Sequence, residues 1–378
     1  MGVVRIAAVL AVRGVRFRCH RALGRPSAVE ALSLEVTRRC IARCVMCSIW
    51  RTPRDLPELD AAGWLGVLSS ASLGRLVELD ITGGEPFLRD DLGRLLAGLG
   101  ELKAGHLPRL QSVAVTTNGL LTRRVLEVVA GVGPGLAARG IGLVIALGMD
   151  GVGELHDRIR NVSGAWRRLD ETVRGLEGLR RQVPGLVLGL KTTVTRYNAG
   201  ELDRIADYAD EHGLFLIVSP YIVTPVRYAN VDLEEDLELS PRDREALRRF
   251  YEGPRFRWSH YRRELLRFLE TGRMEKACSA GFNYCFIRST GDVYPCPLIE
   301  PGLGNVREST LDGLLRSPAA AAQRRRVGRL PECRTCTEPG LERYALPFEG
   351  WHYLRELLRL GPRGFAALHA HLGLDKYL

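Results

Sequence analysis

The fold of this chain is decided by the stretch Thr37-Arg-Arg-Cys-Ile-Ala-Arg-Cys-Val-Met-Cys-Ser48. It directly follows a β-branched run and places Cys40, Cys44 and Cys47 in C-x3-C-x2-C spacing. A cubane iron-sulfur cluster has four iron corners, and a loop of this kind can wrap three of them. The fourth iron is then free for a ligand that is not protein, and chemistry can take place there.

Outward from this loop, short β-branched runs alternate with longer helical stretches, as in βα units. The candidate strands are 31–37, 77–82, 112–117, 142–147, 186–194 and 214–219. The candidate helices lie near 58–74, 90–104, 122–131, 165–181 and 200–212. We predict an α/β fold in the form of a partial (β/α)6 TIM-like barrel of parallel strands, with an open sheet covered on both faces as the alternative.

Polar and glycine-rich motifs follow four of these strands. The cysteine loop comes after the first, Gly83-Gly84-Glu85-Pro86 after the second, Thr117-Asn118-Gly119 after the third and Met149-Asp150-Gly151 after the fourth. Ligands of parallel α/β folds gather at the carboxyl ends of the strands. We therefore expect one edge of the sheet to collect all four motifs.

The chain divides into four segments by charge and periodicity. A basic extension covers 1–30, the strand-helix core covers 31–235, and a polar stretch with Glu234, Glu235 and Asp236 marks its end. A smaller domain of a β-hairpin plus helices is expected over 236–345, followed by amphipathic helices over 346–378.

The two motifs C-x3-C-x2-C and Gly-Gly-Glu-Pro, at successive strand ends, closely resemble the radical S-adenosylmethionine (SAM) enzymes over residues 31–220. This resemblance implies that Cys40, Cys44 and Cys47 ligate a [4Fe-4S] cluster whose open iron is chelated by SAM. A reductant such as flavodoxin or ferredoxin would supply the electron that breaks a carbon-sulfur bond of SAM. The resulting 5'-deoxyadenosyl radical would abstract a hydrogen atom from substrate.

The resemblance also implies which residues contact SAM. The glycines let backbone approach it, Glu85 or nearby backbone meets its ammonium group, and Met46 stands where many relatives carry an aromatic residue that packs on adenine. Where relatives often read Ser-x-Asp-Gly, this chain reads Gly148-Met149-Asp150-Gly151 and lacks the serine. Three arginines, 38, 39 and 43, place positive charge beside the cluster. The expected SAM contacts are Met46, Gly83, Gly84, Glu85, Pro86, Asn118 and Asp150.

A second cysteine set, Cys278, Cys285, Cys296, Cys333 and Cys336, lies downstream. A turn at Thr290-Gly291-Asp292 between β-rich flanks predicts a hairpin that brings Cys278 and Cys296 together. The spacing resembles the auxiliary-cluster module called twitch, whose longer relative SPASM carries further cysteines. We expect one auxiliary [4Fe-4S] cluster on Cys278, Cys296, Cys333 and Cys336, with Cys285 spare or replacing one of them. A structural zinc ribbon is the alternative.

Composition indicates the redox compartment of the protein and its possible partners. Nine cysteines in 378 residues, five of them in C-x3-C or C-x2-C arrangements, indicate metal ligation in a reducing cytoplasm rather than disulfides. The formal charge of +10 is compatible with nucleic acid or an anionic membrane, although arginine-rich genome composition explains it equally. The basic amphipathic ends leave peripheral membrane contact open, and no apolar run is long enough to span a bilayer.

These observations predict an oxidative or coupling radical SAM enzyme acting on a small molecule or peptide in natural-product or cofactor biosynthesis. A membrane lipid is an alternative substrate. A zinc-stabilised nucleic-acid-binding protein is the alternative from another class, and we expect no nucleic-acid partner. Tyr221, Arg227 and Tyr228 follow the last strand, where relatives bind substrate, but loop position identifies no molecule.

Overall fold

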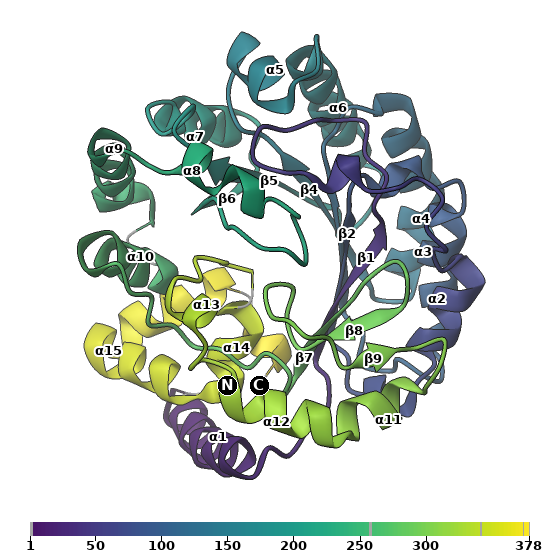
Figure 1. Ribbon diagram of the computed structural model, residues 1–378, viewed down its shortest axis with the longest axis vertical. Helices are drawn as coiled ribbons and strands as arrows, with labels where there is room; N and C mark the ends of the chain where they lie inside the picture. The colour runs from purple at the N-terminus through teal and green to yellow at the C-terminus, as the bar shows by residue number, and fades with distance from the viewer. Residues whose placement is uncertain (1–2, 257–258, 341, 373, 378) are drawn as a thin grey trace.

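The computed structural model describes residues 3–256, 259–340, 342–372 and 374–377, and Figure 1 shows their arrangement. Within these residues, six parallel strands neighbour one another in chain order and curve into a partial barrel, as predicted. Each lies within one residue of its predicted bounds. They are β1 (Ala31–Thr37), β2 (Glu78–Gly83), β3 (Ser112–Thr117), β4 (Gly142–Gly148), β5 (Val187–Val194) and β6 (Phe215–Pro220).

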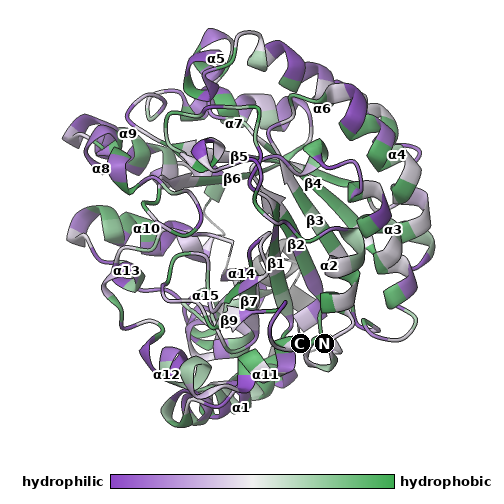
Figure 2. Ribbon diagram, turned by 45° about the vertical axis from the view of Figure 1, so that its right-hand side comes forward, coloured by the Kyte–Doolittle hydropathy of each residue, from purple (hydrophilic) through white to green (hydrophobic). Residues whose placement is uncertain are grey.

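Helices cover the outside of this barrel, and Figure 2 shows hydrophobic residues along the strands and on the covering helices. The helix after β3 is longer than predicted because its apolar face continues past Gly131 to Leu136. Gly133 permits this, since a Cβ there would lie 2.4 Å from a methyl of Val183. The covering helices are α2 (Ala61–Leu68), α3 (Leu92–Leu102), α4 (Thr122–Ala138), α5 (Glu154–Arg160), α6 (Ala165–Arg180) and α7 (Leu202–Glu211).

The two faces of the barrel sheet differ in character because side chains alternate along a strand. On β1, Leu32, Leu34 and Val36 belong to the large apolar core beneath the helices. The alternate residues Ser33 and Glu35 point the other way, into the barrel. The lumen is therefore polar, and it is the side on which a ligand can be bound.

The C-terminal hairpin extends this same sheet. β7 (Tyr284–Ile287) pairs in parallel with β1, and β8 (Asp292–Tyr294) and β9 (Gly304–Asn305) follow antiparallel. The predicted hairpin is confirmed, whereas its union with the barrel has no signal in the sequence. The segment boundaries at 30, 235 and 345 stay predictions. Helices of this half are α8 (Glu234–Leu237), α9 (Pro241–Glu252), α10 (His260–Thr271), α11 (Leu311–Arg316), α12 (Pro318–Arg326) and α13 (Pro331–Arg334).

The two ends of the described chain pack together. The basic N-terminal segment forms helix α1 (Val3–Leu23), which lies beside α14 (Glu342–Glu349) and α15 (Trp351–Leu372) in Figure 1. Phe17 contacts Phe348 edge to face, with ring centroids 5.7 Å apart. Among the described helices, none is long and apolar enough to cross a membrane. Peripheral membrane contact stays a prediction.

Candidate functional site

Cys40, Cys44 and Cys47 line one cleft at the carboxyl ends of the strands, with about 1000 Å³ of space not filled by atoms. Backbone bonds to α5 hold their loop: Arg43 N donates to Arg160 O at 3.0 Å, and Val45 N to Ile159 O at 2.9 Å. Burial raises the pKa of both Cys40 and Cys47 to about 12. Half-buried thiols with such raised pKa values are inert by themselves, and a metal is what would stabilise their thiolates.

Gly83 and Gly84 line the same cleft. Gly84 N donates to Thr37 O and Glu85 N to Arg39 O, both at 2.8 Å, so this turn is tied directly to the cysteine loop. A Cβ on Gly83, whose φ is +152°, would lie 2.3 Å from Thr37 O. A Cβ on Gly84 would lie 2.3 Å from Arg39 O. These glycines are required by the crossing of two loops, in addition to any approach of a cofactor.

Glu85 and Pro86 lie behind the wall of the cleft instead of in it. The Glu85 side chain is fully buried, and both of its oxygens already accept hydrogen bonds. Oε1 accepts from Thr117 Oγ1 at 2.8 Å and Oε2 from Asn118 N at 2.7 Å. The Glu85 carboxylate therefore joins the second and third strand ends, and a contact of Glu85 or nearby backbone with the ammonium group of SAM stays a prediction. Burial raises the pKa of Glu85 to about 7, although the hydrogen bonds that it accepts act in the opposite direction.

Asn118, which this carboxylate holds, lines the cleft, and its Nδ2 lies 3.8 Å from Cys40 Sγ. Met46 also lines the cleft, and its contact with adenine stays a prediction. Asp150 does not line the cleft. It is fully buried, pairs with Arg160 at 2.7 Å and accepts a bond from Thr193 N at 2.8 Å. The carboxylate of Asp150 positions Arg160, and the expected contact of Asp150 with SAM stays a prediction.

The charge beside the thiols differs from expectation. Arg39 and Arg43 are exposed, and buried Arg38 lies 3.7 Å from Glu35. Arg160 instead faces the thiols, with Nη1 3.6 Å from Cys44 Sγ. Sequence reasoning missed this role because nothing in the spacing of Arg160 separates it from the many other arginines.

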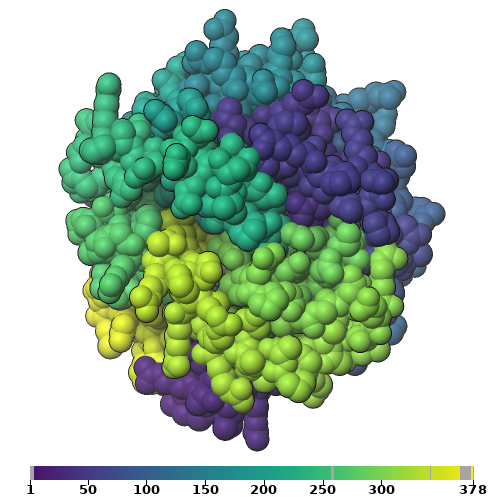
Figure 3. All heavy atoms as spheres, in the orientation of Figure 1, coloured from purple at the N-terminus to yellow at the C-terminus, as the bar shows by residue number. Residues whose placement is uncertain are grey.

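The loop after β6 covers the cysteine loop, and the two segments lie side by side in the space-filling view (Figure 3). Ser48 N donates to Tyr228 O at 2.9 Å, and Asn230 Nδ2 donates to Met46 O at 2.9 Å. Tyr221, Arg227 and Tyr228 all line the cleft, and their contact with a substrate stays a prediction. Asn230, fully buried, is a second residue that the sequence did not single out.

A second cavity, with about 960 Å³ of space not filled by atoms, is lined by Cys278, Cys296, Cys333 and Cys336. Leu298 N donates to Cys296 Sγ at 3.3 Å and Gly328 N donates to Cys333 Sγ at 3.2 Å. Backbone donors of this kind fit sulfur atoms that carry negative charge in an iron-sulfur site. Cys285 lies elsewhere, on β7 in the apolar core beneath the sheet. The geometry therefore separates Cys285 from the other four.

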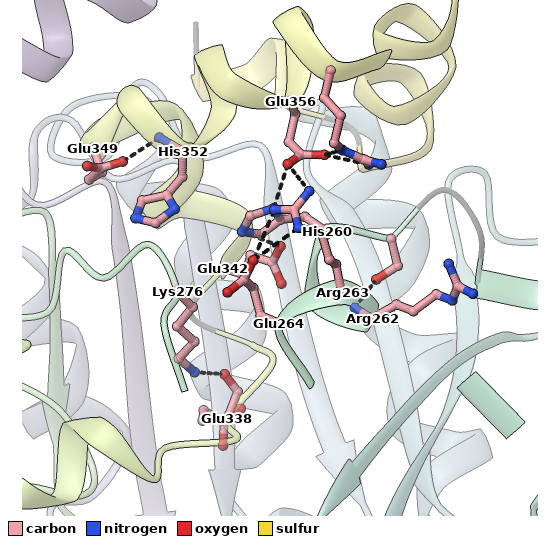
Figure 4. Close-up of polar contacts among 12 residues, drawn as sticks. His260, Arg262, Arg263, Glu264, Lys276, Glu338, Glu342, Glu349, His352 and Glu356 are labelled. Carbon is pink, nitrogen blue, oxygen red and sulfur yellow. Dashed lines mark hydrogen bonds and ion pairs between the residues drawn. The ribbon is translucent and has the colours of Figure 1, made fainter. Parts of the chain in front are cut away.

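A buried polar network lies next to this cavity (Figure 4). His260 Nδ1 is 3.3 Å from Glu356, and Arg263 also contacts Glu356. These bonds hold the pKa of Glu356 down, at about 2, whereas burial raises the pKa of Glu342. Lys276 donates to the backbone oxygen of Glu338 and lines the cavity beside the cysteines. The network brings α10 and α15 together behind the second cysteine set.

The donor sets of the two cavities fit iron-sulfur clusters: three thiols at the first and four at the second, each beside hydrogen-bond donors. Across the residues that the structure describes, no group of three or more His, Cys, Asp and Glu side chains is arranged to hold a single metal ion.

Comparisons with known proteins agree with this fold and site. Residues 34–209 match the radical SAM superfamily, and residues 278–337 match the SPASM iron-sulfur cluster-binding domain. The chain therefore belongs to the radical SAM superfamily and carries a C-terminal SPASM domain. It is an enzyme that uses SAM and [4Fe-4S] clusters, including an auxiliary one.

Two curated relatives and one solved structure illustrate the likeness. The AdoMet-dependent heme synthase of Methanosarcina barkeri is 27% identical over 307 residues, which span 75% of this chain and 80% of that protein. The mycofactocin maturase MftC of Mycobacterium tuberculosis is 26% identical over 324 residues, 80% of this chain and 76% of its own. The structure of anSMEcpe with bound AdoMet superposes with a TM-score of 0.58 at 17% identity, covering 92% of this chain and 99% of that one.

Proposed function

We propose that this enzyme couples reductive cleavage of SAM, at a [4Fe-4S] cluster held by Cys40, Cys44 and Cys47, to oxidation or coupling of its substrate. The supporting observation is the convergence of these three thiols on one cleft at the strand ends. When bound, the cluster and SAM supply the electron transfer and the hydrogen-atom abstraction that start such reactions. The substrate is a small metabolite or a peptide of natural-product or cofactor biosynthesis.

The chain's own residues bind and orient under this proposal. Met46 supplies an apolar face for adenine, and Gly83 and Gly84 supply backbone close to SAM. The side chain of Asn118 donates to SAM or to a cluster thiolate. Glu85 positions Asn118, because its carboxylate accepts a hydrogen bond from the backbone amide of Asn118. The loop after β6 holds the cysteine loop in place, because Asn230 Nδ2 donates to Met46 O.

The second cysteine set holds an auxiliary [4Fe-4S] cluster through Cys278, Cys296, Cys333 and Cys336 in this proposal. A cluster with four protein thiolates has no open iron for substrate, so it serves electron transfer. It would take the second electron when the substrate is oxidised. The curated relatives are named for heme synthesis and for mycofactocin maturation, so membership of the family leaves the substrate itself open.

The test is anaerobic reconstitution followed by SAM cleavage. We expect a brown protein with iron and sulfide in equal amounts, which releases 5'-deoxyadenosine and methionine when dithionite and SAM are added. Cys44→Ala should abolish this release, whereas Cys19→Ala, which alters an exposed thiol, should leave it unchanged. A colourless protein with stoichiometric zinc, or full release from Cys44→Ala, would contradict the proposal.

A further inference from the structure

The charges that line the first cleft are all of one sign. Among the described residues of its lining, the charged side chains are Arg160, Lys191 and Arg227, and none is Asp or Glu. Arg160 has a carboxylate partner, because Asp150 lies 2.7 Å from it. The other two cations of the lining are Lys191 and Arg227.

Lys191 points into the barrel lumen from β5. It lies in register with Gly148 on β4, where no side chain blocks it, and its Nζ donates to Thr116 Oγ1 on β3 at 2.9 Å. Burial lowers the pKa of its ammonium group. Within the described residues, no ion pair of 4.0 Å or less is recorded for Lys191. Lys191 is half-buried, and an ammonium group in this position with a neutral hydroxyl as its hydrogen-bond partner remains poorly compensated.

Arg227 reaches the same place from the loop after β6. Its Nη2 donates to Thr82 Oγ1 at 3.2 Å, and its guanidinium lies 5.4 Å from the ring centroid of Tyr228. For Arg227 too, the described part of the chain provides no carboxylate within ion-pairing distance. A guanidinium presents a fork of N–H donors that matches a carboxylate in two bonds.

Both cations also line a smaller cavity deeper in the barrel, so they stand at the boundary of the two spaces. Three acids, Glu78, Asp80 and Glu338, line only the deeper cavity, and Glu78 is paired with Arg343 and Lys376. Asp80 accepts a bond from Ser33 Oγ at 3.1 Å, and Glu338 Oε1 accepts one from Gly340 N at 2.9 Å. These acids attract the cations at a distance without pairing, and the face of Lys191 and Arg227 toward the cleft stays free for an anion.

We propose that Lys191 and Arg227 together bind a carboxylate group of the substrate, with the rest of the substrate lying against Tyr221, Ile222 and Tyr228. The proposal rests on the function proposed above, because it places this carboxylate in the cleft where SAM is cleaved. Two kinds of substrate carry such a carboxylate: a small organic acid, and a peptide with a free C-terminus or an acidic side chain. Bound there, the carboxylate fixes which end of the substrate lies deepest in the barrel.

The experiment measures binding to the reconstituted enzyme with SAM present, under anaerobic conditions, by calorimetry. Benzoate is compared with benzamide, and alanyl-alanyl-phenylalanine with its C-terminal amide. We expect at least one of the two carboxylates to bind at least 10-fold tighter than its amide, and which pair shows it distinguishes the two kinds of substrate. Lys191→Gln and Arg227→Gln should each remove this preference, and Lys191→Arg should retain part of it.

The controls are Lys103→Gln and Arg123→Gln, which alter cations at the outer helices and should leave binding unchanged. Equal binding of carboxylates and amides in both pairs, or an unchanged preference in Lys191→Gln and Arg227→Gln, would overturn the proposal. So would a loss of SAM affinity in these variants, because the cations would then serve the cofactor. Failure of SAM cleavage in the unaltered enzyme contradicts the proposed function instead, and these readouts keep the two failures apart.

Discussion

The two cysteine sites are built in different ways. The first takes its three thiols from one loop of eight residues, Cys40 to Cys47, which backbone bonds tie to α5 and, just before Cys40, to the turn after β2. The second takes its thiols from residues 278 to 336, so the fold itself has to bring them to one cavity. The first site therefore depends on local geometry at the strand ends, whereas the second depends on long-range packing.

The largest expected effect is the loss of iron from the second site while the first site stays active. Cys333→Ala with Cys336→Ala should remove the auxiliary iron while dithionite-driven release of 5'-deoxyadenosine continues, because the first loop is independent of these thiols. Iron and sulfide counts with product analysis check this. Release that falls as completely as in Cys44→Ala would show that the two sites do not fold independently.

A second large effect concerns the C-terminal packing. Glu78 at the start of β2 accepts bonds from Lys376 Nζ at 2.6 Å and Tyr377 Oη at 2.9 Å, and also contacts Arg343. Although burial alone would raise it, these partners hold the pKa of Glu78 at about 2, below its usual 4.5. The stabilisation is present above pH 4.5 and is lost as the pH falls toward 2. It amounts to about 3 kcal/mol.

Urea denaturation at pH 7 and at pH 3.5 measures this contribution. Glu78→Gln should lower the free energy of unfolding at pH 7 and flatten part of its decline toward acid pH. Glu252→Gln, which alters a carboxylate at the surface, is the matched control. An unchanged stability of Glu78→Gln at pH 7 would contradict the role given to this contact.

A smaller effect is expected from the carboxylate behind the first site. Glu85→Gln keeps the size of the side chain but replaces one carboxylate oxygen with an NH2 group. That group cannot accept the hydrogen bond that Thr117 or Asn118 now donates. A buried donor left unpaired costs about 1–3 kcal/mol. We expect this loss of stability together with weaker SAM binding, measured by denaturation and calorimetry. Glu127→Gln on the exposed face of α4 serves as the control.

The smallest effect lies at the second site. Lys276 is a half-buried cation beside Cys336. Burial alone would lower the pKa of its ammonium group, but the charge of Cys336 raises that pKa above its usual value. A positive charge next to an anionic cluster favours its reduced form. Lys276→Met should therefore make the auxiliary cluster harder to reduce, with unchanged iron content, as measured by a redox titration followed by EPR. An unchanged potential would mean that the cation is screened from the cluster.

Much of the fold was predictable because it depends on local periodicity. Alternating β-branched runs located all six barrel strands, and the cysteine spacing located the first site. The pairing of β7 with β1 was not predictable, since a short strand carries no mark of its distant partner. Glu85 and Asp150 were expected to contact SAM, and the structure places them behind the cleft because nearby amides and Arg160 occupy their oxygens.

By itself, the sequence determined the class of chemistry and the order of the elements, because cysteine spacing and apolar periodicity are properties of neighbouring residues. Only the tertiary structure decided that Cys285 stands apart from the other four cysteines downstream, that Arg160 faces the first thiols, and that Lys191 and Arg227 meet in the lumen. The physical reason is that a side chain's partners are set by competition among groups far apart in the chain, which only the folded molecule brings together.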